Sequence, residues 1–112
     1  RKPTSGSLGG RNAKNKIMNI KELHTDQKAV SAVSLFKGEN SMANAIQIQK
    51  NETLKEHITK IPALLLCVDG EVVFENEKSE KHTLKKGDYV HIEPNVKHWL
   101  VAKETCQLVL FK

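Results

Sequence analysis

Histidines are the side chains best suited to chemistry in this sequence, because a neutral imidazole titrates near physiological pH and can move a proton or bind a metal. There are five of them. His82 lies in the charged stretch EKSEKHTLKK and is expected in solvent, and His91 alternates with two apolar neighbours and should point outward. His24 precedes the strand-rich region and indicates nothing. His57 and His98 are left as candidates, and their setting depends on the segments around them.

Two glutamines offer a second set of polar groups. Gln47 and Gln49 alternate with Ile46 and Ile48, so the glutamines share one face of a strand and the isoleucines share the other. If the glutamine face lines a pocket, both are candidate ligand-binding residues. The commoner meaning of such alternation is one solvated face and one buried face.

Two cysteines, Cys67 and Cys106, both lie in apolar runs. A disulfide framework would need more cysteines and a secreted context. We expect two buried free thiols that act as small hydrophobes. No apolar segment resembling a secretory signal is visible near the start, so a reducing cytoplasm is the expected compartment.

The elements that must position these groups are strands. Short β-branched and apolar segments are separated by turn residues, which is typical of an all-β sandwich or barrel. Asp69-Gly70 predicts a two-residue hairpin, and Asn19 followed by Glu22 predicts a short helical turn near 19–24. The expected strands cover residues 28–36, 42–50, 53–58, 63–68, 71–75, 89–92, 97–102 and 106–111.

The net charge of +5 belongs to one end of the chain. Residues 1–17 hold five basic residues and no acidic one, whereas residues 18–112 hold 13 of each sign. We expect residues 1–17 to be a flexible basic tail, either a leader or expression remnant or a native basic arm, and 18–112 to be one domain. The neutral domain predicts no specific nucleic-acid partner, and no apolar run is long enough for a membrane span.

Two segments resemble the two sequence motifs of the cupin family. Residues 87–99 are similar to the second motif, with His98 at a metal-ligand position and Asn95 where the motif has glycine. Residues 51–70 are similar to the first motif. Its positions are matched as follows: Asn51 and Gly70 stand at the glycines, His57 and Thr59 at the two histidines, and Ala63 at the glutamate. The resemblance covers residues 28–112 and implies a small double-stranded β-helix barrel resembling a jelly roll.

The resemblance also implies a metal site, which this sequence keeps only in part. The family's set is three histidines and one glutamate, and only His57 and His98 match it. Thr59 offers a poor neutral ligand, Ala63 offers none, and Glu56 should point to the face opposite His57. We therefore expect no tightly bound cofactor, with a weak divalent transition metal at His57 and His98 left open.

The leading prediction is a single-domain protein that binds a small molecule, with His57, His98, Gln47, Gln49 and Thr59 as candidate ligand-binding residues. The alternative is a cupin-type enzyme. It would be a metal-dependent oxygenase or isomerase working through a reduced two-histidine site, or a metal-free enzyme using histidine acid–base catalysis. A third alternative is a structural dimer without a ligand. The motif register predicts that the two histidines lie close together and that at least one has a lowered pKa.

A homodimer is the expected assembly. Residues 28–36 carry apolar side chains on both alternating faces, and a strand that is apolar on both faces is covered on both sides. In a body of this size a second copy is a natural cover for a first strand, and cupins commonly pair in this way.

Overall fold

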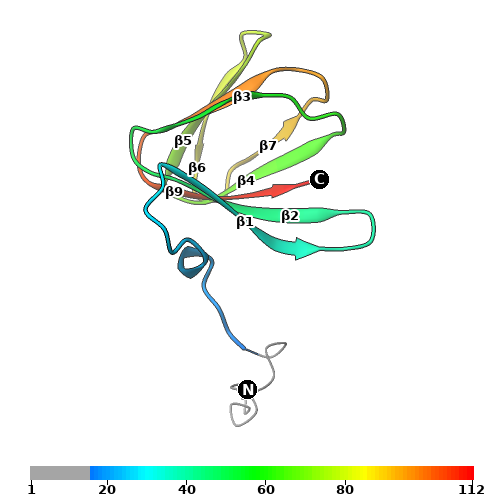
Figure 1. Ribbon diagram of the computed structural model, residues 1–112. Helices are drawn as coiled ribbons and strands as arrows, with labels where there is room; N and C mark the ends of the chain where they lie inside the picture. Colours follow the sequence, from blue (N-terminus) through cyan, green and yellow to red (C-terminus); the bar gives the residue numbers. More distant parts are fainter. Residues whose placement is uncertain (1–15) are drawn as a thin grey trace.

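Two β-sheets face each other across a shared core in the computed structural model, which describes residues 16–112 (Figure 1). The larger sheet has the strand order β1-β2-β9-β4-β7, and the smaller has the order β3-β8-β5-β6. All the strand pairs are antiparallel. The strands are β1 (Val30–Lys37), β2 (Met42–Ile48), β3 (Thr53–His57), β4 (Ala63–Asp69), β5 (Glu71–Asn76), β6 (Lys81–Lys85), β7 (Tyr89–Ile92), β8 (His98–Ala102) and β9 (Cys106–Phe111).

The all-β prediction is confirmed, and the described part of the chain contains no helix with the length and apolar character that crossing a bilayer requires. The expected tail falls almost wholly on residues 1–15, which lie outside the described residues.

Alternation along the strands builds the core between the sheets. Ile48, Leu65 and Leu108 of the larger sheet meet Val72 and Leu100 of the smaller one, and all five are fully buried. Burying one such aliphatic side chain contributes about 1.5–3 kcal/mol relative to leaving it in water. The apolar pattern seen in the sequence is therefore the inward face of each sheet.

Two asparagines make the sharp turns where the motifs have glycine. Asn51 has φ 69° and Asn95 has φ 65°, so both occupy the left-handed region that few other side chains tolerate. The Asn51 N–H donates to the Ala102 carbonyl and the Asn95 N–H to the Thr59 carbonyl, both at 2.8 Å. These turns tie β3 and the segment after it to both ends of β8.

The prediction of a two-residue hairpin at Asp69-Gly70 is wrong. β4 and β5 belong to different sheets, and Gly70 is the single residue between them, so the chain turns a corner from one sheet to the other. Gly70 has φ 88°, and a Cβ there would lie 2.4 Å from the Thr105 carbonyl oxygen. A close backbone approach, and not a two-residue turn, requires this glycine.

Strand β6 was not predicted from the sequence. It forms the edge of the smaller sheet, and Leu84 is its only buried residue. One apolar residue among charged neighbours leaves no strand pattern to detect. The backbone pairing with β5 determines the strand instead.

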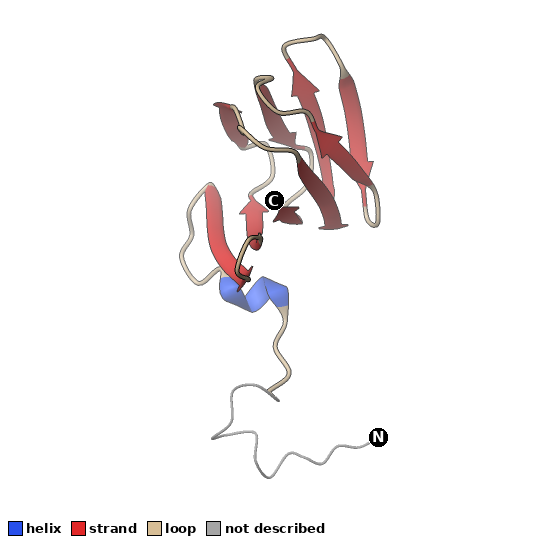
Figure 2. Ribbon diagram, turned by 90° about the vertical axis from the view of Figure 1, so that its right-hand side faces the viewer, coloured by secondary structure: helices blue, strands red, loops and turns tan. Residues whose placement is uncertain are grey.

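The predicted helical turn is present as the short 3₁₀ helix η2 (Ile20–Leu23), drawn in blue beside the strands in Figure 2. The Asn19 side chain accepts a hydrogen bond from the Lys21 N–H at 2.9 Å and so caps the turn. Lys21 pairs with Asp69 of β4 at 2.9 Å, and the His24 ring bonds to the Ser31 hydroxyl of β1 at 2.8 Å. Residues 19–24 thus lie as a strap across the larger sheet.

Two glycines with similar backbone angles give a matched test of the corner. Gly87 has φ 91°, but a Cβ placed on it would meet no atom within 4 Å. Gly87→Ala should therefore lower the free energy of unfolding only by the cost of a positive φ for alanine, about 1 kcal/mol. Gly70→Ala adds the clash with Thr105 and Cys106 and should destabilise the fold by several times as much. Denaturant unfolding of both variants measures this, and equal losses would contradict the close approach.

The two cysteines are free and buried, as the sequence predicts. Burial raises the pKa of both thiols, that of Cys106 to about 11. Because the thiolate is the reactive form, a thiol reagent at neutral pH should label neither cysteine in the folded chain and both after denaturation. Rapid labelling of the native protein would show that this core opens readily.

Candidate functional site

His57 and His98 come together where β3 ends and β8 begins. They are direct partners across the two strands, and their ring centroids lie 4.8 Å apart in an edge-to-face arrangement. His98 is 3% exposed and stacks on Phe74 of β5 at 5.8 Å, whereas His57 is exposed. One imidazole is thus held inside the fold, and the other lies over it toward solvent.

Backbone carbonyls orient both rings. His57 Nδ1 donates to the Lys55 carbonyl oxygen at 3.0 Å, and His98 Nδ1 donates to the Val96 carbonyl oxygen at 3.4 Å. A carbonyl only accepts, so Nδ1 carries the proton in each ring. In the neutral state each Nε2 therefore presents a lone pair, which suits it to accept a hydrogen bond or a proton.

The surroundings of His98 favour its uncharged form. Removal from water is the main cause that lowers the pKa of His98, and the nearby charges of His57 and Lys112 lower it further. The hydrogen bond to Val96 opposes this shift and does not cancel it. The predicted lowering of one histidine's pKa is present at His98.

Thr59 lies two residues beyond His57 and is 6% exposed. Its hydroxyl oxygen is buried and has no hydrogen-bond partner among the described residues. An unpaired buried hydroxyl costs about 1–3 kcal/mol, which a suitably placed water or ligand atom would recover. Thr59 therefore carries unused hydrogen-bonding capacity two residues beyond His57 in the sequence.

A groove of about 450 Å³ includes Thr59 in its lining. The groove lies at one end of the sandwich, which we call the mouth. The β1–β2 hairpin, the segment after β3 and the end of the chain surround the groove. Three lysines line the groove, against one glutamate, Glu39. None of them forms an ion pair with another residue of the described range 16–112. The lysines are Lys37, Lys60 and Lys112.

The structure does not bring Gln47 and Gln49 to this place. Ile46 and Ile48 take the inward face of β2, so both glutamines point to the outside of the larger sheet. Gln47 accepts a hydrogen bond from Gln107 of β9 at 2.7 Å, and Gln49 bonds to Thr105 at 3.5 Å. The glutamine face is the outer face of the sheet and does not line the mouth.

The three lysines at the mouth could not be found from sequence. Lys37 ends β1, Lys60 follows β3, and Lys112 follows β9, so only the fold brings them to one groove. Lysine is also abundant throughout this chain, which removes any compositional signal.

The donor set at the motif positions does not fit a tightly held metal. His57 and His98 supply two imidazoles, but Thr59 adds only a neutral hydroxyl and Ala63 only a methyl group. Within residues 16–112 no three side chains of histidine, cysteine, aspartate or glutamate gather into a group that would hold an ion. Catalytic zinc normally takes three protein ligands, and non-haem iron takes two histidines and a carboxylate.

The family model described as "Cupin domain" matches residues 45–111, which is more than half of the sequence. The chain belongs to the cupin family. Comparison with curated proteins finds none that matches. Cupins often bind metal, but this member keeps two of the four ligand positions that its resemblance to the motifs implies.

Solved structures agree on the fold. A cupin superfamily protein from Desulfitobacterium hafniense has a TM-score of 0.76 at 14% identity, with 88% of this chain and 90% of that chain covered. An RmlC-like cupin family protein with a double-stranded β-helix fold from Methanocaldococcus jannaschii has a TM-score of 0.67 at 23% identity, covering 79% and 83%. A conserved protein of unknown function from Streptococcus pyogenes has a TM-score of 0.74 at 15% identity, covering 87% and 85%.

The lowered pKa of His98 predicts an acid-sensitive fold. The unfolded chain takes up a proton near the ordinary histidine pKa of about 6.5, whereas folded His98 takes it up only at lower pH. Stability from this residue is therefore complete above pH 6.5 and declines as the pH falls toward the folded value. Denaturant unfolding between pH 7 and pH 5 measures this. The free energy of unfolding should fall less steeply with decreasing pH in His98→Gln than in the wild type.

Some dependence of the free energy of unfolding on pH should remain in both the wild type and His98→Gln, because burial lowers the pKa of His24 as well. The exposed His82→Gln variant is the matched control for loss of a histidine, and it should keep the wild-type slope. If His98→Gln and the wild type lose the same unfolding free energy between pH 7 and pH 5, the lowered pKa of the buried His98 is contradicted.

Proposed function

We propose that this cupin binds a small anionic molecule at its mouth, without a tightly held metal ion. The observation that carries the proposal is the groove of about 450 Å³, whose lining contains three lysines, one glutamate and Thr59, a residue with a buried and unpartnered hydroxyl. The volume falls within the range of roughly 300–1,000 Å³ that is usual for small-molecule sites.

The charge of the groove selects the class of ligand. Counting side chains alone, three ammonium groups against one carboxylate leave an excess of two positive charges, and no ion pair joins these lysines to another side chain of residues 16–112. A bound carboxylate or phosphate would receive charge-assisted hydrogen bonds, which are about twice as strong as neutral ones. An anion therefore fits this groove better than a neutral molecule of the same size.

The neighbouring polar groups support the same assignment. The Thr59 hydroxyl can donate to an anionic oxygen. The positive charge of Lys112 already reaches His98, since it helps to lower the pKa of that ring. Neither histidine is among the residues that line this groove, so a ligand would have to extend beyond the groove to contact His57, which is exposed beside His98. In this proposal His57, His98 and Thr59 keep the ligand-binding roles expected from the sequence.

The second candidate is a metal-free enzyme, and the state of His98 favours it. A buried imidazole that stays neutral, with its Nε2 lone pair free, is suited to accept a proton from a bound substrate. In that case the anionic group would be the anchor and His98 the base. Exchange of solvent deuterium into a bound carboxylic acid, lost in His98→Gln, would distinguish the enzyme from a pure binder.

Calorimetry with a defined probe set tests the binding proposal. The probes are sulfate, inorganic phosphate, malonate and citrate, with malonamide as the neutral match for malonate. We expect at least one anion to bind, malonamide to bind more weakly than malonate, and Lys112→Gln and Lys60→Gln each to weaken the anion roughly tenfold, or about 1.4 kcal/mol.

Lys103→Gln is the control, because Lys103 is exposed and does not line the groove. It should leave anion affinity unchanged. The proposal is contradicted if malonamide binds as tightly as malonate, if Lys103→Gln weakens binding as much as the groove variants do, or if no probe binds.

A further inference from the structure

We propose that the ligand of the groove at the mouth is an anion with two charged ends, such as a dicarboxylate, and that it joins the two sheets of the sandwich there. The groove, called here the mouth groove, is the one in which the proposed function places an anion. The inference therefore rests on that proposal and adds to it the class of ligand.

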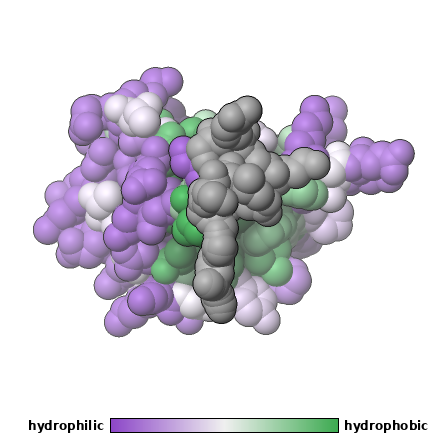
Figure 3. Space-filling model, turned by 90° about the horizontal axis from the view of Figure 1, so that it is seen from below, coloured by the Kyte–Doolittle hydropathy of each residue, from purple (hydrophilic) through white to green (hydrophobic). Residues whose placement is uncertain are grey.

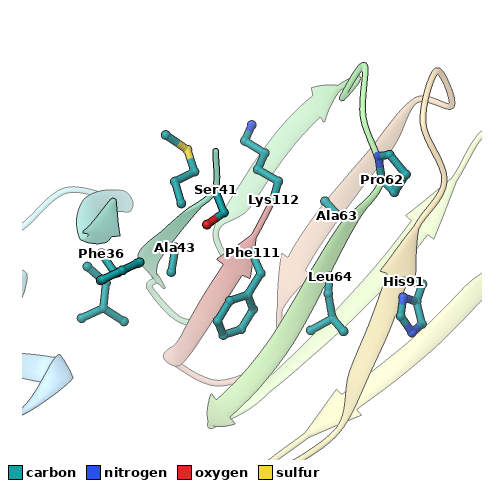
Figure 4. A pocket seen from close by; sticks show the side chains of 11 residues that line it. Phe36, Ser41, Ala43, Pro62, Ala63, Leu64, His91, Phe111 and Lys112 are labelled. Carbon is teal, nitrogen blue, oxygen red and sulfur yellow. The ribbon is translucent and has the colours of Figure 1, made fainter. Parts of the chain in front are cut away.

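The first wall of the mouth groove belongs to the larger sheet. It consists of the β1–β2 hairpin from Lys37 to Met42 and of Lys112, which follows β9. The Met42 N–H donates to the Lys112 carbonyl at 2.8 Å, and the Lys112 N–H donates to the Met42 carbonyl at 3.1 Å. Lys37 is the register partner of Met42 on β1, so these three residues form one row across the end of the sheet. Figure 4 shows Lys112 at the tip of β9, beside Ser41 of the hairpin.

This row lies on the side of the larger sheet that faces the smaller one. Successive side chains of a strand alternate between its two faces. Leu110 packs on the core two residues before Lys112, and Ile46 is buried in the core four residues after Met42. Met42 and Lys112 therefore share the inward face, and Lys37 shares it as the partner of Met42. The side chains of both lysines leave the backbone on the side of the smaller sheet.

The second wall consists of residues 59–61, which follow β3 of the smaller sheet. The Thr59 carbonyl accepts the hydrogen bond from the Asn95 N–H, which holds this wall to the turn before β8. The wall carries one exposed lysine, Lys60, and the Thr59 hydroxyl, which is buried and has no partner in the described range. An ammonium group and a hydroxyl are both donors to a carboxylate or phosphate oxygen.

No hydrogen bond or ion pair among residues 16–112 joins the two walls directly. The backbone hydrogen bonds of residues 37–42 and 112 stay within the larger sheet, whereas that of the Thr59 carbonyl goes to Asn95. The five ion pairs of the described residues contain no residue of the mouth groove. The groove therefore has two walls that are held separately, and each wall carries positive charge.

A two-ended anion satisfies both walls at once. One charged end binds Lys37 and Lys112 on the first wall, and the other binds Lys60 and the Thr59 hydroxyl on the second. An anion with one charged group offsets the charge of one wall only and leaves the ammonium groups of the other unpaired. Counting side chains alone, the groove has an excess of two positive charges, which a dianion neutralises.

A neighbouring groove of about 680 Å³ suits such a ligand less. It shares Ser41, Met42 and Lys112 with the mouth groove, but its lining is mainly apolar, and Lys112 is its only residue with a full charge at neutral pH (Figure 4). Figure 3 shows hydrophobic surface on the side of the larger sheet, seen from below. A second carboxylate would lose water there without gaining a partner. Lys37 and Lys60 line the mouth groove and not the apolar one.

Calorimetry with matched pairs of ligands tests the two-ended anion. The ligands are malonate, succinate, glutarate and adipate, each compared with its own monoamide, which keeps the length and has one charge. We expect the dicarboxylate whose length matches the groove to bind at least roughly tenfold tighter than its monoamide, because hydrogen bonds between charged groups are the strong ones.

Variants of each wall show whether both ends are bound. Lys60→Gln changes the second wall, and the double variant Lys37→Gln/Lys112→Gln changes the first. Each should bring the affinity of the best dicarboxylate close to that of its monoamide, because one end loses its partner. All three lysines are exposed, so circular dichroism should show an unchanged fold. Lys103→Gln, which lies off the groove, should keep the wild-type preference.

The outcomes separate the two-ended anion from the anion site itself. If anions bind but no dicarboxylate exceeds its monoamide beyond the statistical advantage of two equivalent ends, the two-ended anion is overturned and the anion site remains. The same conclusion follows if the variants of only one wall lower the preference, because both ends would then contact that wall, or if Lys103→Gln lowers it equally. If neither dicarboxylates nor monoamides bind, both proposals are overturned.

Discussion

The pairing of β3 with β8 is the constraint on which the site depends. Two short strands bring His57 and His98 into direct register, and hydrogen bonds at the corners hold both ends of that pair. The corners require positive φ, which Asn51 and Asn95 tolerate and most residues do not. The same ties place Thr59 beside the hairpin of β1 and β2. Loss of this register would separate the histidines and displace Thr59, which lines the mouth groove.

The electrostatics of the mouth follow from that geometry. Burial is the main cause that lowers the pKa of His98, and Lys112, which contributes to this shift, is also one of the three lysines that line the mouth groove. Protonation of His98 would add a further charge to an already cationic region, so the arrangement favours the arrival of an anion over the uptake of a proton. The proposed function uses this difference and needs no metal to supply the positive charge.

The fold and the histidine pair were accessible from sequence because local rules determine them. Short β-branched and apolar segments between turn residues predicted eight of the nine strands, and the left-handed preference of asparagine matched the observed turns. The failures have physical causes. Strand β6 depends on its partner and not on its own pattern, Gly70 serves a close approach, and Gln47 points outward because Ile46 and Ile48 fill the core. Lys37, Lys60 and Lys112 are far apart in sequence, and only tertiary structure brings them together.

The most direct test of the anion proposal is the titration of the His98 ring by NMR, in wild-type protein with and without sulfate, which stays doubly charged throughout the pH range needed. An anion bound among the lysines would offset the positive charges that act on His98. The account predicts that saturating sulfate raises the pKa of His98 in the wild type and has a smaller effect in Lys112→Gln. A His98 pKa that sulfate leaves unchanged, although calorimetry shows that sulfate binds, would place the anion elsewhere and contradict the proposed site.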